Sequence, residues 1–249
     1  MKNLIYAAAV LALAACAPAN QDTTATGTTS TTATAANTTM STNPASATTS
    51  SSMSDMKVQP ASTSAAAEEN RPMSYYQNKV AELHTSAGEI DIRFFPDVAP
   101  NHVKNFIDLS EQGFYNGTKF HRVIPGFMIQ GGDPNTKSGD SASWGTGGSG
   151  KYVPAEFNTV KHKRGIVSMA RSNDPDSASS QFFIMVADYP SLDGKYSVFG
   201  QVTKGMDVAD KIVNAKTTGA EGSRPITPTT VNKVVIRDAK DDEKGPTPK

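Results

Sequence analysis

A glycine-rich segment is the first pattern in this sequence that could bind a ligand. Residues 145–150 satisfy G-x-G-x-x-G, and with Lys151 they nearly satisfy the phosphate-binding pattern G-x-x-x-x-G-K-[ST]. Both patterns need a helix directly after the loop, so that its N-terminus faces the phosphate. Pro154 interrupts such a helix, and Tyr152 stands where the magnesium-binding hydroxyl belongs. We therefore interpret the segment as a flexible glycine loop without a nucleotide.

Histidine and serine residues could serve metal binding or covalent catalysis, but their contexts favour neither. The histidines show no paired spacing of the kind that zinc sites use: His84, His102, His121 and His162. The only cysteine is Cys16, far from the other candidates. The sequence has no G-x-S-x-G, and Ser168 falls within a predicted strand. We expect no metal, no cofactor and no covalent intermediate.

Four spaced blocks carry more information than these single patterns. Residues 120–133 read FHRVIPGFMIQGGD, and they are followed by SMA at 168–170, SQFFI at 180–184 and LDGKYSVFG at 192–200. In content and order these blocks resemble the signature of the cyclophilin family of peptidyl-prolyl cis-trans isomerases. The resemblance extends over about residues 81–235.

The resemblance implies a catalytic arginine at Arg122. It also implies a proline pocket and a peptide-binding groove formed by Phe127, Met128, Gln130, Ala170, Arg171, Phe183, Leu192 and Tyr196. The family often has asparagine in place of Arg171, tryptophan in place of Ser191 and histidine in place of Tyr196. Loss of the tryptophan removes one edge of the pocket and an indole donor, so we expect weak cyclosporin binding.

The chemistry of prolyl isomerisation suits these residue types. The uncatalysed rotation barrier is roughly 18 to 20 kcal/mol, and the enzyme must bind the twisted bond better than either planar isomer. The twisted nitrogen gains a lone pair, to which a permanently charged guanidinium such as that of Arg122 can donate a hydrogen bond. Such a bond contributes about 1.5 to 3 kcal/mol, which is one or two decades in rate at about 1.36 kcal/mol each. The apolar pocket must supply the remainder by gripping the proline ring and excluding water.

Periodicity predicts the elements that hold these residues. Residues 80–84 and 89–95 flank a turn and predict a β-hairpin. Pro100 begins a helix that Gly113 ends, with Val103, Phe106, Ile107 and Ser110 at the i, i+3, i+4, i+7 spacing, and 206–215 forms a second helix. Further strands are predicted at 119–124, 127–131, 166–170, 182–187, 197–202 and 231–237.

Many short strands with two separated helices indicate a closed barrel or a sandwich. The resemblance selects the first: a mainly β fold with a closed eight-stranded antiparallel β-barrel capped by two α-helices. Adjacent strand residues point to opposite faces, so we assign Phe182 to the core and Phe183 to the pocket.

The two ends of the chain differ in composition from this domain. Residues 1–15 read as a secretory signal peptide, and the run LAAC at 13–16 resembles the lipobox of bacterial lipoproteins, which implies a lipidated Cys16. An ordinary signal peptide with a chance cysteine is the alternative. Residues 16–74 are rich in threonine, serine and alanine and predict a disordered tether, with a glycosylated stalk as the rival interpretation. The isomerase domain then covers 75–240, and 241–249 is predicted to be a disordered tail.

The net charge and the export signal limit which partners we expect. Lysine plus arginine equals aspartate plus glutamate at 24 each, so no global field attracts nucleic acid. We expect a monomer that is anchored by lipid in the cell envelope, facing the periplasm, with the outer membrane preferred because Ala17 is not aspartate, or exposed at the cell surface. Its partners are proline-containing unfolded or partly folded exported proteins. The alternative function is a chaperone or surface adhesion module that holds proline segments with little turnover.

Overall fold

The computed structural model describes residues 71–245 together with 247 and 248. The predicted signal peptide, the lipidated Cys16 and the tether up to residue 70 lie outside the described residues. Within the described part, none of the helices has the length and apolar character needed to cross a bilayer.

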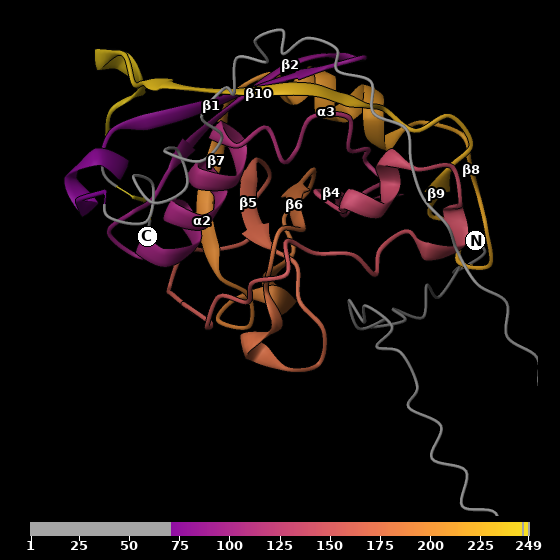
Figure 1. Ribbon diagram of the computed structural model, residues 1–249, viewed down its shortest axis with the longest axis horizontal. Coiled ribbons are helices and arrows are strands. Elements are labelled where there is room, and N and C mark those ends of the chain that lie inside the picture. The colour runs from indigo at the N-terminus through magenta and orange to yellow at the C-terminus, as the bar shows by residue number, and fades with distance from the viewer. Residues whose placement is uncertain (1–70, 246, 249) are drawn as a thin grey trace, which may run out of the picture. The chain divides into compact units, whose positions relative to one another are not determined.

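Eight strands form one antiparallel sheet in the order β10-β1-β2-β7-β5-β6-β4-β3 (Figure 1). The strands are β1 (Lys79–Thr85), β2 (Gly88–Phe94), β3 (Arg122–Ile124), β4 (Met128–Gly131), β5 (Ile166–Met169), β6 (Phe182–Met185), β7 (Val198–Lys204) and β10 (Val231–Asp238). The predicted hairpin is β1–β2, and the other predicted strands all occur, although β3, β4, β5 and β6 are shorter than expected.

The closed barrel that we expected is not shown: the strand order is that of an open half-barrel with β10 and β3 at its two ends. The chain just before β3 meets the start of β10 at an isolated bridge between Lys119 and Thr230, which does not extend into a ladder between the two strands. The chain before β10 lies along the gap instead and makes separate contacts, among them Phe120 N–H to the Thr229 carbonyl (3.0 Å) and Val123 N–H to the Ser223 carbonyl (2.8 Å). This segment contains Pro225 and Pro228, which lack the N–H that a continuous ladder needs. Part of it folds on itself as the two-stranded sheet β8 (Thr217–Thr218) and β9 (Arg224–Pro225).

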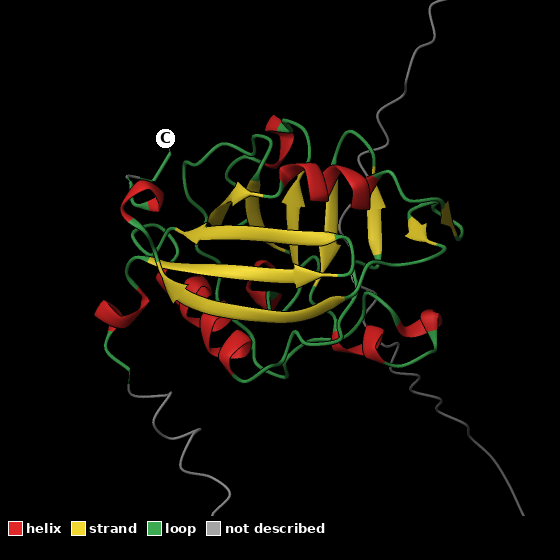
Figure 2. Ribbon diagram, turned by 90° about the horizontal axis from the view of Figure 1, so that it is seen from above, coloured by secondary structure: helices red, strands yellow, loops and turns green. Residues whose placement is uncertain are grey.

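Two α-helices pack against the sheet, as predicted. Helix α2 (Pro100–Glu111) has proline at its first turn and buries Val103, Phe106 and Ile107. Helix α3 (Met206–Val213) ends two residues earlier than expected. It follows Gly205, whose φ is 90°, and a Cβ there would lie 2.1 Å from the Glu89 carbonyl oxygen, so only glycine fits. Figure 2 shows the helices on both sides of the curled sheet.

Short 3-10 helices, which the sequence analysis did not predict, join several of these elements. They are η1 (Met73–Tyr76), η2 (Pro134–Lys137), η3 (Ser141–Ser143), η4 (Pro175–Ser177), η5 (Pro190–Leu192) and η6 (Asp241–Glu243). The last falls in the predicted disordered tail, whereas the structure places it against β10. Glu243 there accepts two hydrogen bonds of 2.6 Å from Arg237, which lower the pKa of Glu243 to about 2.

The sheet separates two apolar clusters, one on each face. Ile129, Ile184 and Val167 pair across β4, β6 and β5 and belong to the larger cluster inside the half-barrel. Phe106 of α2 and Phe182 belong to the same cluster, with ring centroids 5.3 Å apart, so the assignment of Phe182 to the core is confirmed. The residues that alternate with these in the strands face the opposite way and form a second cluster, which includes Met128, Phe183 and Met185.

Candidate active site

A row of directly paired residues crosses four strands on the outer face of the sheet. Arg122 of β3 pairs with Gln130 of β4, Gln130 pairs with Phe183 of β6, and Phe183 pairs with Ser168 of β5. Side chains that are directly opposite in an antiparallel ladder lie on one face, about 4.5 to 5.5 Å apart at Cβ. The register therefore brings together three of the predicted site residues, although 61 positions separate Arg122 from Phe183 in the sequence.

The Arg122 guanidinium lies partly buried at the end of this row. Its side chain is 15% exposed, and Nη1 is buried without a hydrogen-bond partner among the described residues. Its ion-pair partner is Glu221, whose Oε2 lies 3.6 Å from Nε. Burial lowers the pKa of Arg122, and Glu221 opposes that effect, so the group remains a cation at neutral pH. A buried charged donor without a partner is costly unless a ligand supplies the acceptor.

The predicted apolar pocket residues gather beside the guanidinium. Met128, Phe183, Leu192 and Ala170 belong to the outer cluster. Phe127 and Tyr196 are partly buried and pack against its margin. The Tyr196 ring meets the Phe183 ring edge to face at 5.6 Å. An apolar surface with one cation at its border is suited to a small aliphatic ring attached to a polar amide.

Tyr189 is a member of this wall that the sequence analysis missed. Its ring lies 4.4 Å from that of Phe127, centroid to centroid, and it packs against the outer cluster. Ser191, where relatives often carry tryptophan, is exposed. No motif marked Tyr189, although it directly precedes Pro190 and η5.

A chain of amide hydrogen bonds fixes the orientation of Gln130. Gln181 Nε2 donates to the carbonyls of Gly145 (2.9 Å) and Gly147 (2.8 Å), so its Oε1 must face Gln130, whose Nε2 donates to it at 2.9 Å. Gln130 Oε1 then remains buried without a partner among the described residues. The glycine loop thus positions a side chain of the site. A Cβ on Gly147 would lie 2.2 Å from Asp133 Oδ1, which explains the need for glycine there.

Arg171 and Ala170 are the predicted residues for the peptide backbone. The Arg171 guanidinium lies over the Tyr196 ring at 4.8 Å and donates from Nη2 to the Lys195 carbonyl at 3.0 Å, so it holds the Tyr196 ring in place. The Ala170 N–H donates to the Gln181 carbonyl at 2.9 Å and is therefore occupied within the protein. A peptide that bound along residues 170–171 would therefore have to contact backbone groups other than the Ala170 N–H.

His162 packs against Phe183, one of the predicted pocket residues, and the sequence analysis gave it no role in the site. Its ring stacks on Phe183 with the planes 19° apart and the centroids 6.2 Å apart. Its Nε2 lies 3.0 Å from Ser168 Oγ, and its Nδ1 lies 3.2 Å from Asp193 Oδ1. The three residues resemble a hydrolytic triad in order, but Ser168 is 0% exposed and no substrate can reach it. The arrangement is structural and holds Phe183 in place.

One cluster of carboxylates could attract a metal ion, but two basic side chains of the protein already pair with it. Ligand atoms of Glu82, Glu89 and Asp91 lie within 4.8 Å of one another on β1 and β2. Arg237 bonds Glu82 and reaches Asp91 at 3.2 Å, and Lys204 lies 3.3 Å from Glu89. These side chains neutralise most of the charge that a metal ion would need.

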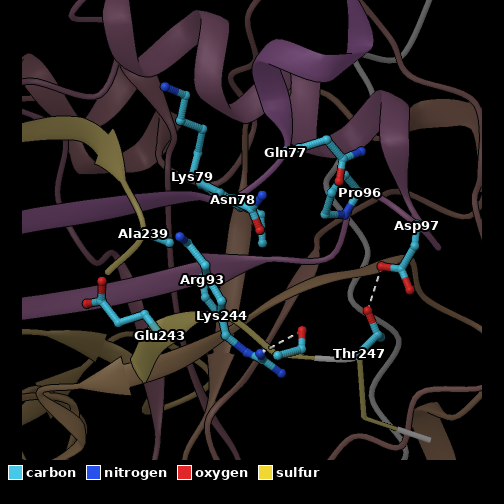
Figure 3. A pocket seen from close by; sticks show the side chains of 12 residues that line it. Gln77, Asn78, Lys79, Arg93, Pro96, Asp97, Ala239, Glu243, Lys244 and Thr247 are labelled. Atoms are coloured by element: carbon cyan, nitrogen blue, oxygen red, sulfur yellow. Dashed lines mark hydrogen bonds between the residues drawn. The ribbon is translucent and has the colours of Figure 1, made fainter. Parts of the chain in front are cut away.

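A crevice of about 170 Å³ lies elsewhere on the domain, and none of its lining residues is a predicted site residue (Figure 3). Its walls come from β1, β2 and the tail. Arg93 Nη1 donates to the Gly245 carbonyl at 3.2 Å, and Thr247 Oγ1 donates to Asp97 Oδ1 at 2.5 Å. The crevice is therefore the seam along which the C-terminal tail docks.

Comparisons with known proteins agree with the geometry. The family model described as cyclophilin type peptidyl-prolyl cis-trans isomerase/CLD matches residues 80–239. A Brucella abortus protein named "Probable peptidyl-prolyl cis-trans isomerase" is 50% identical over 135 residues, covering 52% of this chain and 69% of the relative. Peptidyl-prolyl cis-trans isomerase A of Dickeya dadantii is 46% identical over 164 residues, covering 64% and 82%. A crystal structure of a Cryptosporidium parvum cyclophilin type isomerase in the presence of the dipeptide Ala-Pro has a TM-score of 0.57 at 33% identity, covering 64% of this chain and 99% of that one.

The buried His162 predicts a pH-dependent stability. Burial, only partly opposed by Asp193, lowers the pKa of His162 below its ordinary 6.5, so the unfolded chain binds the proton more tightly than the folded one. Stability is therefore full above about pH 6.5 and decreases as the pH falls below that value. We expect the thermal midpoint, followed by circular dichroism, to fall between pH 7.5 and 5.5, and to fall less steeply in His162→Gln.

His121 contributes a residual slope in that variant, because burial also lowers its pKa. The matched control is His84→Gln, at a side chain that is 33% exposed, which should keep the wild-type slope. Equal slopes in wild type and His162→Gln would contradict the assignment.

Proposed function

The chain belongs to the cyclophilin-type peptidyl-prolyl cis-trans isomerases, and we propose that its isomerase activity depends on the Arg122 guanidinium beside the pocket of Met128 and Phe183. The observation that carries this proposal is the buried Nη1 of Arg122, a charged donor that no described residue satisfies. Arg122 lies in the same cross-strand row as Phe183 and on the same face of the sheet.

In the proposed reaction the proline ring enters the apolar pocket and the prolyl amide lies beside Arg122. Rotation removes the amide resonance, and the nitrogen then carries a lone pair that can accept a hydrogen bond from the guanidinium. The planar isomers offer no such acceptor, so the bond forms only near the top of the barrier and lowers it. No proton is transferred and no covalent bond breaks.

The pocket contributes through fixed geometry. Phe183 is held by His162 on one side and by Tyr196 on another, so its ring presents a constant floor to the substrate. Excluding water from this surface strengthens the hydrogen bond from Arg122, because the local dielectric constant falls. Met128 adds an adaptable side chain to the wall.

Gln130 is proposed to hold the peptide on one side of the proline. Gln181 fixes the orientation of the Gln130 amide, because Gln130 Nε2 donates to it. Gln130 Oε1 has no partner among the described residues and could accept from a peptide N–H, whereas only the second hydrogen of Nε2 could donate to a peptide carbonyl. The bound segment would therefore be extended, with its backbone groups exposed to the groove.

For the substrates we propose proline-containing segments of exported proteins that are unfolded or partly folded. The Cryptosporidium relative crystallised with Ala-Pro supports the proline-containing class. The run LAAC at 13–16 supports export and a lipid anchor at Cys16 in the cell envelope. A holding module with little turnover is the second candidate, favoured by the exposed Ser191 and by Tyr196 in place of the family's frequent residues.

Arg122→Ala should lower kcat/KM for isomerisation of a short prolyl peptide by at least about ten-fold, since one charged hydrogen bond is lost. The measurement is a protease-coupled assay on the purified protein. The thermal midpoint should change little, because Nη1 has no partner among the described residues and the ion pair at Nε is with the exposed Glu221. Arg164→Ala, which removes a surface ion pair with Asp210, is the matched control and should retain full activity.

Three results would contradict this account in different ways. Unchanged kcat/KM in Arg122→Ala would remove the arginine from the mechanism. Unfolding of that variant would make Arg122 a structural residue. A wild-type protein that binds the peptide without accelerating its isomerisation would favour the holding module.

Cys16→Ser should release the full-length protein from membranes into the soluble fraction, because the thiol is the proposed site of acylation. Each buried methylene of an acyl chain contributes about 0.8 kcal/mol to membrane attachment. The check is fractionation followed by detection of the domain in each fraction. An unchanged membrane fraction would rule out lipidation at this residue.

Cyclosporin should inhibit the enzyme only weakly, because an exposed serine at 191 replaces a wall residue and its indole donor. Titration of the inhibitor in the same coupled assay tests this expectation. Inhibition at nanomolar concentration would show that Tyr189, or another residue, replaces the missing wall.

A further inference from the structure

Glu221 is a charged group beside Arg122 that no sequence pattern marked. Its Oε2 lies 3.6 Å from Nε of Arg122, and its own side chain is 53% exposed. It belongs to the turn between β8 and β9, far along the chain from β3. A carboxylate so close to a catalytic cation either holds it in place or weakens its field, and the two possibilities predict opposite effects of its removal.

The turn that carries Glu221 is attached to the strand that carries Arg122. The Ser223 carbonyl accepts from Val123 N–H at 2.8 Å, directly beside Arg122 in the chain. The next residue, Arg224, makes a second attachment on the same side of the turn, because its Nη1 donates to Ser141 Oγ at 2.9 Å. Ser223 is buried, and its hydroxyl lies 3.4 Å from Glu221 Oε2. The position of the carboxylate is thus defined relative to β3.

The direction of the contact suits a positioning role. Glu221 approaches the Nε side of the guanidinium, whereas the buried unpartnered atom is Nη1. Because the guanidinium is planar and rigid, fixing the Nε edge fixes the direction of both Nη groups. At 3.6 Å the contact is an ion pair that is longer than a hydrogen bond, so it consumes no donor that a substrate needs.

We propose that Glu221 is a positioning residue of the isomerase, which orients the Arg122 guanidinium so that Nη1 faces the prolyl nitrogen. The proposal rests on the catalytic role of Arg122 given above. It assigns to the β8–β9 turn a part in catalysis, although that turn contributes no wall to the pocket. An ion pair with one exposed partner contributes little to folding stability, so a structural explanation for the contact is weak.

Glu221→Ala should lower kcat about three- to ten-fold and change KM less than two-fold, because the peptide still binds the pocket while the guanidinium samples other rotamers. Glu221→Asp should recover part of the loss, and Glu221→Gln should behave like the alanine variant at low salt. The ratio of wild-type to Glu221→Gln activity should fall toward one in 1 M NaCl, where the screening length is about 3 Å. Asp210→Asn, which weakens an arginine–carboxylate pair away from the site, is the control and should show neither effect, although that pair is closer, at 2.7 Å.

A double-mutant cycle separates this inference from the proposed function. In the Arg122→Ala background, Glu221→Ala should have no further effect on kcat, because the residue acts only through the guanidinium. An equal loss in both backgrounds, or a gain in activity for Glu221→Ala alone, would overturn the positioning role. If Arg122→Ala itself left kcat/KM unchanged, the proposed mechanism would fail first, and the Glu221 variants would then be expected to match wild type.

Discussion

The alternation of side chains along β3, β4 and β6 is the constraint on which the site depends. One set of alternate residues fills the interior of the half-barrel, and the other set forms a second apolar surface that includes Met128 and Phe183. Because the strands pair in register, Arg122, Gln130 and Phe183 fall in one row. A shift of one residue in any of these pairings would place the guanidinium in the core and destroy both surfaces at once. Fold and site are therefore specified by the same hydrogen bonds.

Polar groups outside the sheet complete the site by removing freedom from its members. His162 and Tyr196 restrict the Phe183 ring, and Gln181 restricts the Gln130 amide. His162 and Gln181 are not among the predicted substrate-binding residues, whereas Tyr196 is. Arg122 Nη1 and Gln130 Oε1 are buried without partners among the described residues, and a ligand there would supply the missing hydrogen bonds.

The sequence predicted the features that depend on neighbouring residues, and it did not predict those that depend on contacts between distant segments. Both helices, the hairpin and the six other strands of the main sheet followed from periodicity and turn residues, and the opposite assignment of Phe182 and Phe183 followed from strand alternation. The open sheet did not follow from the sequence. Pro225 and Pro228 interrupt pairing only because their segment lies along β3, which is a tertiary contact. Glu221 and Tyr189 carry no motif, and only tertiary contacts place them beside Arg122 and Phe127. The sequence context was enough to predict that the glycine loop binds no nucleotide. It did not predict that carbonyls of this loop accept hydrogen bonds from Gln181.

The proline-containing segment beside β3 also bears on solubility. An unpaired strand offers a row of amide groups on which another polypeptide can add by β-pairing, a common route to aggregation. Here β3 ends the sheet and carries Arg122, so the sheet edge and the proposed catalytic residue lie on the same strand. A covering segment interrupted by two prolines occupies that border without extending it. For the unfolded or partly folded substrates proposed above, this segment would keep a bound chain from adding to the sheet at β3.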